Sequence, residues 1–147
     1  MRVVLDTNIL ARPSFSATGP AADLLDRLQA AEHLLIVSEF IVSELYRVLR
    51  YPRLMALHGF NDAAISQYIA DIEAASLFVD VRANDVFPVI GHDPDDDSVI
   101  ATAVVGKADV LCSLDRHLHR PEVRDHCLRF GIRVLTDLEL LRELRLP

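Results

Sequence analysis

Short, almost entirely apolar runs alternate along this chain with longer amphipathic stretches, and this alternation limits the folds open to it. Five of the apolar runs indicate buried strands: 2–6, 34–37, 77–81, 110–114 and 132–135. The stretches between them carry apolar residues at the spacing of helices that bury one face. Strands that are apolar on both faces need helices on both sides, as in a parallel sheet. We therefore predict an α/β fold with three layers and a central parallel sheet of about five strands.

Start signals for helices stand where such a fold requires them. The expected helices begin at Gly19-Pro20, Ser38, Asn61, about Asp96 and Thr136. Ser38 and Asn61 are good N-caps, and Thr136 forms a capping box with Glu139. We expect the helix after Ser38 to end near Pro52 and the helix after the acidic run to cover 96–105. No linker or repeat interrupts the pattern, so we expect one domain over 1–147.

Composition narrows the classes of function. The chain has 147 residues, 51% of them hydrophobic, and a formal net charge of −7. That charge argues against a protein that holds nucleic acid by bulk positive charge. No apolar run approaches the roughly 18–20 residues of a membrane span, and the N-terminus turns acidic too early for a signal peptide, so we expect a cytoplasmic protein. Cys112 lies in an apolar run and is expected to be a reduced core thiol, and neither it nor Cys127 has catalytic or disulfide spacing.

Carboxylates follow the strands of the predicted sheet. Asp6 ends the first strand, Asp115 follows the fourth, and the acidic run 93–97 opens a helix. The functional groups of parallel sheets gather at the carboxyl ends of the strands, where the strand order reverses. If these ends meet, the carboxylates converge on one cleft. Taken singly, each acid has the ordinary alternative of a turn or helix-cap role.

Glu44 differs because its helical neighbours Ile41, Leu45 and Val48 are apolar, which places it close to the buried face. A carboxylate there needs a partner. An intrahelical ion pair with Arg47 would provide one. The alternative is a divalent cation shared with the other acids, and oxygen ligands without zinc-spaced His or Cys favour Mg²⁺ or Mn²⁺. Hydrolysis of phosphodiesters is the natural chemistry of such a site.

Four segments, in chain order, resemble the motifs of PIN-domain nucleases. They are Val3-Val4-Leu5-Asp6-Thr7-Asn8, Val42-Ser43-Glu44-Leu45, Asp93-Pro94-Asp95-Asp96-Asp97 with Val99-Ile100-Ala101-Thr102-Ala103, and Ser113-Leu114-Asp115-Arg116-His117-Leu118. The resemblance extends from Met1 to the helix start at Thr136-Asp137-Leu138. It is nearest to the VapC-like proteins assigned to prokaryotic toxin–antitoxin systems.

The resemblance implies a PIN-like fold and an endoribonuclease that hydrolyses RNA with Mg²⁺ or Mn²⁺. The catalytic and metal-binding acids that it implies are Asp6, Glu44, Asp97 and Asp115, with Asp95 or Asp96 able to share the role of Asp97. Asn8 and Ser113 match polar residues that orient carboxylates or a water beside the metal. The resemblance also implies an antitoxin protein as the partner that restrains the enzyme.

Basic side chains near the acids are candidates for RNA contacts. Arg47, Arg50 and Arg53 recur at three-residue spacing after Glu44, and we expect Arg47 and Arg50 to bind phosphates. A solvated helix end is the alternative. Three histidines could contact RNA or assist proton transfer, although surface or capping roles are more usual for each: His92, His117 and His119.

Two other functions stay open at this point. One is a PIN-like binding module without catalysis, and the other is a metal-dependent phosphatase. Asp6-Thr7-Asn8 resembles the nucleophile motif of haloacid-dehalogenase-like phosphatases, but Asn8 stands where that motif needs a second Asp. The segments 47–60 and 61–75 carry more apolar residues than a connection needs. We expect them to form a surface for a homodimer and for an antitoxin peptide.

Overall fold

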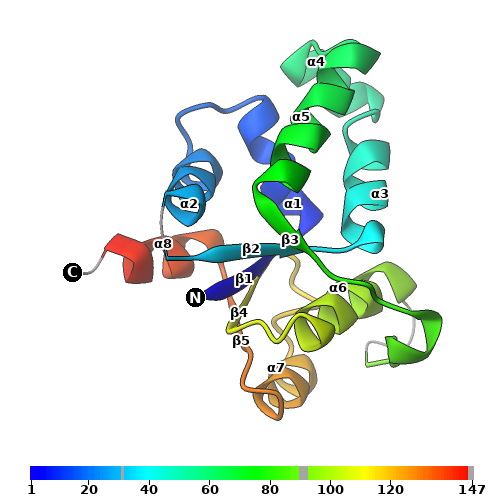
Figure 1. Ribbon diagram of the computed structural model, residues 1–147, viewed down its shortest axis with the longest axis vertical. Coiled ribbons are helices and arrows are strands. Elements are labelled where there is room, and N and C mark those ends of the chain that lie inside the picture. The colour runs from blue at the N-terminus through cyan, green and yellow to red at the C-terminus, as the bar shows by residue number, and fades with distance from the viewer. Residues whose placement is uncertain (31, 90–92, 146–147) are drawn as a thin grey trace.

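A five-stranded parallel sheet forms the centre of the computed structural model, which describes residues 1–30, 32–89 and 93–145. Its strands stand in the order β3-β2-β1-β4-β5, and neighbouring strands pair in parallel (Figure 1). The strands are β1 (Arg2–Leu5), β2 (Leu34–Val37), β3 (Ser76–Phe78), β4 (Val110–Cys112) and β5 (Arg133–Leu135). The predicted α/β class and the parallel sheet are confirmed.

Helices cover both faces of this sheet. They are α1 (Thr7–Leu10), α2 (Pro20–Gln29), α3 (Glu39–Val48), α4 (Pro52–His58), α5 (Asp62–Ala74), α6 (Pro94–Val105), α7 (Pro121–Leu128) and α8 (Asp137–Arg145), with short 3₁₀ turns at Arg12–Ser14 and Ala83–Asp85. Figure 1 shows α6 and α7 on one side of the sheet and α1, α3, α4 and α5 on the other. Helices α2 and α8 pack against each other. Three layers result.

The three inner strands are almost fully buried, which explains why their sequences are apolar on both faces. Val3, Val4 and Leu5 of β1 are at most 1% exposed, and every residue of β4 is buried. Burying this much apolar surface is the main favourable term in folding. Cys112 and Cys127 are buried free thiols, as predicted for Cys112, and burial raises the pKa of each.

Two of the predicted caps form as expected, and one does not. Asn61 accepts a hydrogen bond from the backbone N–H of Ala64, and Thr136 and Glu139 exchange the two bonds of a capping box. Ser38 stands at the N-cap of α3, but its hydroxyl bonds the hydroxyl of Thr102 at 2.7 Å instead of capping the helix. This buried contact ties the start of α3 to α6.

Several predicted boundaries were wrong. The third strand covers Ser76–Phe78 instead of 77–81, and the first and fourth strands end one and two residues earlier than predicted. Pro52 does not simply end a helix, because it occupies the first turn of α4, where its missing N–H costs nothing. Pro121 begins α7 in the same way. Helices α1, α4 and α7 have at most eight residues, too few to give a clear periodic signal.

The sheet reverses its strand order at β1. Strands β2 and β3 extend it on one side of β1, and β4 and β5 extend it on the other. The carboxyl ends of β1, β2 and β4 therefore meet at one edge, around a topological switch point. Within the part of the chain described, no helix is long and apolar enough to span a membrane.

Candidate metal centre

Asp6 lies at the switch point, directly after β1, and is 4% exposed. Its Oδ1 accepts a hydrogen bond from the backbone N–H of Thr7 at 2.8 Å, which caps α1. Its Oδ2 accepts a bond from the Ser113 hydroxyl at 2.6 Å. Burial raises the pKa of Asp6, and these two bonds lower it without cancelling the effect of burial. The carboxylate is thus held in position by groups that follow two neighbouring strands, β1 and β4.

Asn8 and Ser113 connect Asp6 to the loop after β4. The Asn8 amide lies 3.4 Å from both Asp6 Oδ2 and Ser113 Oγ. Ser113 Oγ in turn accepts a hydrogen bond from the backbone N–H of Asp115 at 3.0 Å. Both residues predicted to support the site therefore lie beside its first carboxylate, and they fix the backbone that carries Asp115.

Glu44 reaches the same region from α3. Burial raises its pKa first, and the charges of Asp6 and Asp95 raise it further. Arg47 lies 3.7 Å from Glu44, so the ion pair considered from the sequence does form. It is weak, because the Arg47 side chain is 56% exposed and also pairs with Asp95 at 3.2 Å. The pKa of Glu44 stays raised despite this arginine.

The acidic run at the start of α6 divides between two surroundings. Burial raises the pKa of Asp96 to about 8, together with the charges of Asp115, Asp93 and Asp6. Asp97 is also buried, but it lines a separate pocket whose other residues include Phe87, Ile100, Val104 and Phe130. The structure therefore brings Asp96 to the other acids and places Asp97 on a different face of α6.

This placement favours Asp96, one of the two alternatives named beside Asp97, as the acid of the run that faces the cluster. Consecutive residues of a helix point about 100° apart, so adjacent acids meet different surroundings. Asp95 points elsewhere again, with its side chain 60% exposed and paired to Arg47. The sequence has three adjacent acids here, and the phase of α6 turns Asp96 toward Asp6 and Asp115.

Asp115 and His117 complete the cluster from the loop after β4. Asp115 Oδ1 accepts a hydrogen bond from the backbone N–H of His117 at 2.9 Å. The imidazole Nδ1 of His117 lies 4.0 Å from Asp96 Oδ2. Asp93, Asp96 and His117 each offer one ligand atom, all within 4.8 Å of one another. A metal role of His117 was not predicted from the sequence, where its place two residues after Asp115 was the available signal.

The other two histidines named from the sequence, His92 and His119, are not part of this cluster as the structure describes it. His119 donates from Nε2 to the Ser113 carbonyl at 2.7 Å, and its Nδ1 lies 2.9 Å from Arg124 Nη2, so it stabilises the loop. His92 lies outside the described residues.

Arg50 bonds the Tyr46 hydroxyl and lies 3.2 Å from Asp62, which ties α3 to the start of α5.

This donor set fits a hard divalent cation. Asp6, Glu44, Asp96 and Asp115 supply carboxylate oxygens from four separate segments, and the pKa values of the first three are raised in part by one another's or Asp115's charge. Asp96 Oδ2 is buried and has no hydrogen-bond partner among the described residues. A cation would neutralise this repulsion and give that oxygen a partner.

Comparison with known proteins agrees with this geometry. The sequence profile of the PIN domain matches residues 2–117. The chain belongs to the PIN domain family. The predicted family is thereby confirmed, and its members are generally nucleases.

Two solved structures have a similar fold. PAE2754 from Pyrobaculum aerophilum superposes on this PIN domain with a TM-score of 0.63 and 18% identity, over 98% of this chain and 89% of that one. The second is a chain of VapBC2 from Rickettsia felis, whose structure was solved bound to a DNA fragment from the VapBC2 promoter. It superposes with a TM-score of 0.62 and 13% identity, over 92% of this chain and 98% of that one. A search of curated proteins finds no match.

Metal binding should depend on Asp96 and not on Asp97. Adding Mn²⁺ at about a hundredfold excess over its Kd should raise the melting temperature of the wild-type protein by roughly 5–10 °C, because the ion binds only the folded state. The Asp97→Asn variant should keep this shift and Asp96→Asn should lose most of it. Each shift is measured against the same variant in EDTA. If Asp97→Asn lost the shift and Asp96→Asn kept it, Asp97 would be the metal ligand.

In EDTA, the protein should lose stability as pH rises from about 4 to about 8. The folded state holds a proton on Asp96, whose pKa is raised from 3.8 to about 8, and the unfolded chain releases it. Unfolding then releases protons, so the free energy of unfolding falls with pH across this window. Asp96→Asn removes this titration and should flatten the fall in melting temperature. If the melting temperatures of the two proteins fell in parallel with pH, Asp96 would not hold a proton of raised pKa in the folded state.

Proposed function

We propose that this PIN domain is a metal-dependent endoribonuclease that hydrolyses phosphodiester bonds of single-stranded RNA. One observation carries the proposal: four carboxylates that are far apart in sequence meet at the carboxyl edge of the sheet, where the charges of Asp6 and Asp115 help burial to raise the pKa values of the acids beside them. Clusters of carboxylates without basic partners are uncommon outside functional sites. At a site that hydrolyses phosphodiesters, such carboxylates hold a cation that activates the attacking water.

The cation would be Mg²⁺ or Mn²⁺, held by Asp6, Glu44, Asp96 and Asp115. When bound, it would supply Lewis-acid polarisation of a phosphoryl oxygen and a lowered pKa for water. Ser113 and the Thr7 N–H keep the Asp6 carboxylate in one orientation, so little reorganisation is needed on binding. Asp93 and His117 lie near enough to Asp96 to complete the ligand set or to orient it.

Arg47 is the basic side chain best placed for the substrate. It stands at the mouth of the acidic cluster, between Glu44 and Asp95, and is more than half exposed. An exposed guanidinium can exchange these carboxylates for a phosphate at little cost. The predicted phosphate contact of Arg50 is less well supported, because that side chain is engaged with Tyr46 and Asp62.

Removal of one carboxylate should abolish the reaction. Asp6→Asn keeps the shape of the side chain, removes its charge, and should reduce cleavage of a single-stranded RNA by at least roughly hundredfold. EDTA should stop the wild-type enzyme, and Mn²⁺ or Mg²⁺ should restore it. Asp125→Asn, an exposed acid of α7, is the matched control and should cleave normally. Metal-independent cleavage would refute the mechanism, and no cleavage by the wild type would favour a binding module.

We further propose that the protein acts in the cytoplasm as the toxin of a toxin–antitoxin pair and forms a homodimer. The exposed apolar residues of the 51–57 segment support this: Tyr51 is 44% exposed, Met55 38% and Leu57 57%. A separate groove of about 460 Å³ lies between α3 and α5, lined by Val42, Tyr46 and Ile69 among others. An unpartnered patch of this kind favours contact with another protein chain.

Sedimentation tests this partner surface. The wild-type protein should sediment as a dimer at micromolar concentration, and Leu57→Glu should shift it to a monomer by placing a charge in the apolar contact. Leu128→Glu alters a residue of α7 that is 60% exposed and should leave the dimer intact. A wild-type monomer, or equal loss in both variants, would rule out this surface. Co-expression with the flanking genes should yield a small companion protein if an antitoxin exists.

A further inference from the structure

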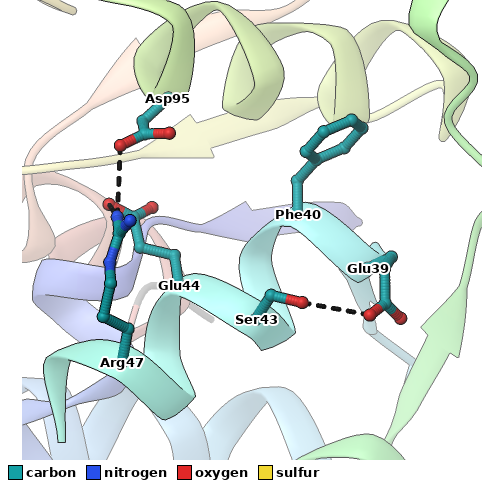
Figure 2. Close-up of a pocket in the computed structure, with 6 residues that line it drawn as sticks. All are labelled: Glu39, Phe40, Ser43, Glu44, Arg47 and Asp95. Atoms are coloured by element: carbon teal, nitrogen blue, oxygen red, sulfur yellow. Dashed lines mark hydrogen bonds and ion pairs between the residues drawn. The ribbon is translucent and has the colours of Figure 1, made fainter. Parts of the chain in front are cut away.

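A pocket of about 290 Å³ opens beside the acidic cluster, between α3 and the start of α6. It is lined by Glu39, Phe40, Ser43, Glu44, Arg47 and Asp95 (Figure 2). Glu44 belongs both to this pocket and to the carboxylate cluster. A molecule that reaches the cluster from this side therefore has room for a further group in the pocket.

Three of the lining residues form one ridge of α3. Phe40, Glu44 and Arg47 are spaced at i, i+4 and i+7, so their side chains lie on the same face of the helix. Figure 2 shows Phe40 and Arg47 projecting from α3 toward α6, with Asp95 facing Arg47 across the opening. Along the helix axis Phe40 lies about 6 Å from Glu44 and about 10 Å from Arg47. The Arg47 guanidinium reaches back to within 3.7 Å of Glu44, so a base at Phe40 and a phosphate at this guanidinium can belong to neighbouring parts of one RNA strand.

The two ends of the pocket carry different charges, and these determine which part of a nucleotide each end can bind. Among the described residues, Arg47 is the only basic one that lines the pocket, and its end is therefore the end that can accept a phosphate. The opposite end holds Glu39 and Phe40, where a phosphate would meet a carboxylate. A flat, uncharged group with hydrogen-bond donors fits there, because Phe40 is 39% exposed and offers part of its ring.

The polar groups at the Phe40 end act as acceptors toward a ligand. The Ser43 hydroxyl donates its proton to Glu39 Oε1 at 3.0 Å, so both side chains keep oxygen lone pairs that can accept further hydrogen bonds. Guanine presents two adjacent donors, N1–H and the N2 amine, on its Watson–Crick edge. Adenine and cytosine present one exocyclic amine, and uracil presents one N–H between two carbonyl acceptors. Unstacked RNA bases are commonly read by aromatic stacking together with bonds to this edge.

We propose that this pocket is a nucleobase subsite in which Phe40 stacks on a base, Glu39 accepts hydrogen bonds from it, and guanine is preferred. Arg47 contacts the phosphate that joins this nucleotide to the one at the acidic cluster. The subsite rests on the proposed nuclease function for its substrate class, and it gives that function a base preference next to the scissile bond.

Binding by the full-length Asp6→Asn protein tests the subsite without cleavage. The probes are fluorescein-labelled oligouridylates, with or without a single guanosine, in Mg²⁺ and followed by anisotropy. The guanosine probe should bind several-fold more tightly. Phe40→Leu should weaken its binding roughly tenfold, and Phe40→Tyr, which keeps the ring, should not. Phe87→Leu alters another exposed aromatic, outside this pocket, and is the matched control.

Two further variants assign the polar roles. Glu39→Gln should reduce the preference for guanosine over uridine, because an amide both donates and accepts. Arg47→Ala should weaken binding of both probes alike and reduce the salt slope by about one. Two results would overturn the subsite. One is equal affinity of the Phe40→Leu and Phe87→Leu variants for the guanosine probe, and the other is no binding of either probe by the Asp6→Asn protein.

The two proposals fail in different ways. Wild-type cleavage of RNA that is unaffected by Phe40→Leu would overturn the subsite and leave the nuclease standing. Guanosine binding that depends on Phe40, in a wild-type protein that cleaves no RNA in Mg²⁺ or Mn²⁺, would support the subsite and overturn the nuclease.

Discussion

The register of β1 between its two neighbours is the constraint on which the site depends. Leu5 pairs with Cys112, and the N–H of Asp6 donates to the Cys112 carbonyl at 2.9 Å. This pairing sets Asp6 beside Ser113, whose hydroxyl binds the carboxylate. A shift of β4 by one residue would point Ser113 to the other face of the sheet and remove that bond. Backbone hydrogen bonds in the core thus position a side chain at the edge.

The same edge concentrates charge that folding alone does not favour. Asp96 is buried, and three other carboxylates raise its pKa together with that burial. The apolar strands on either side offset this cost, since they bury residues such as Val4, Ile36 and Leu111 completely. A stable core therefore allows an unfavourable cluster to persist, a common relation between stability and function.

The parallel sheet and the convergence of acids could be predicted because both follow from patterns of several residues. Apolar runs identify the inner strands, and the switch-point rule brings Asp6 and Asp115 together once those strands are parallel. Which acid of the run faces Asp6 and Asp115 could not be predicted, since it depends on the phase of α6, and the predicted start at about Asp96 was two residues late. The place of His117 beside Asp96 depends on a loop conformation that no periodicity encodes.

Helix α3 connects the acidic cluster to the proposed nucleobase subsite. Its buried residues Ile41 and Leu45 anchor it to the core, while Glu44, between them and solvent, faces the acids. The first turn of α3 is also held by the Ser38–Thr102 bond to α6, the helix that carries Asp96. Phe40 and Arg47 therefore sit on a helix whose position relative to Asp96 is fixed. A base bound at Phe40 would place its phosphate in a defined position at the carboxylates, and binding energy from that base would act on the geometry of cleavage.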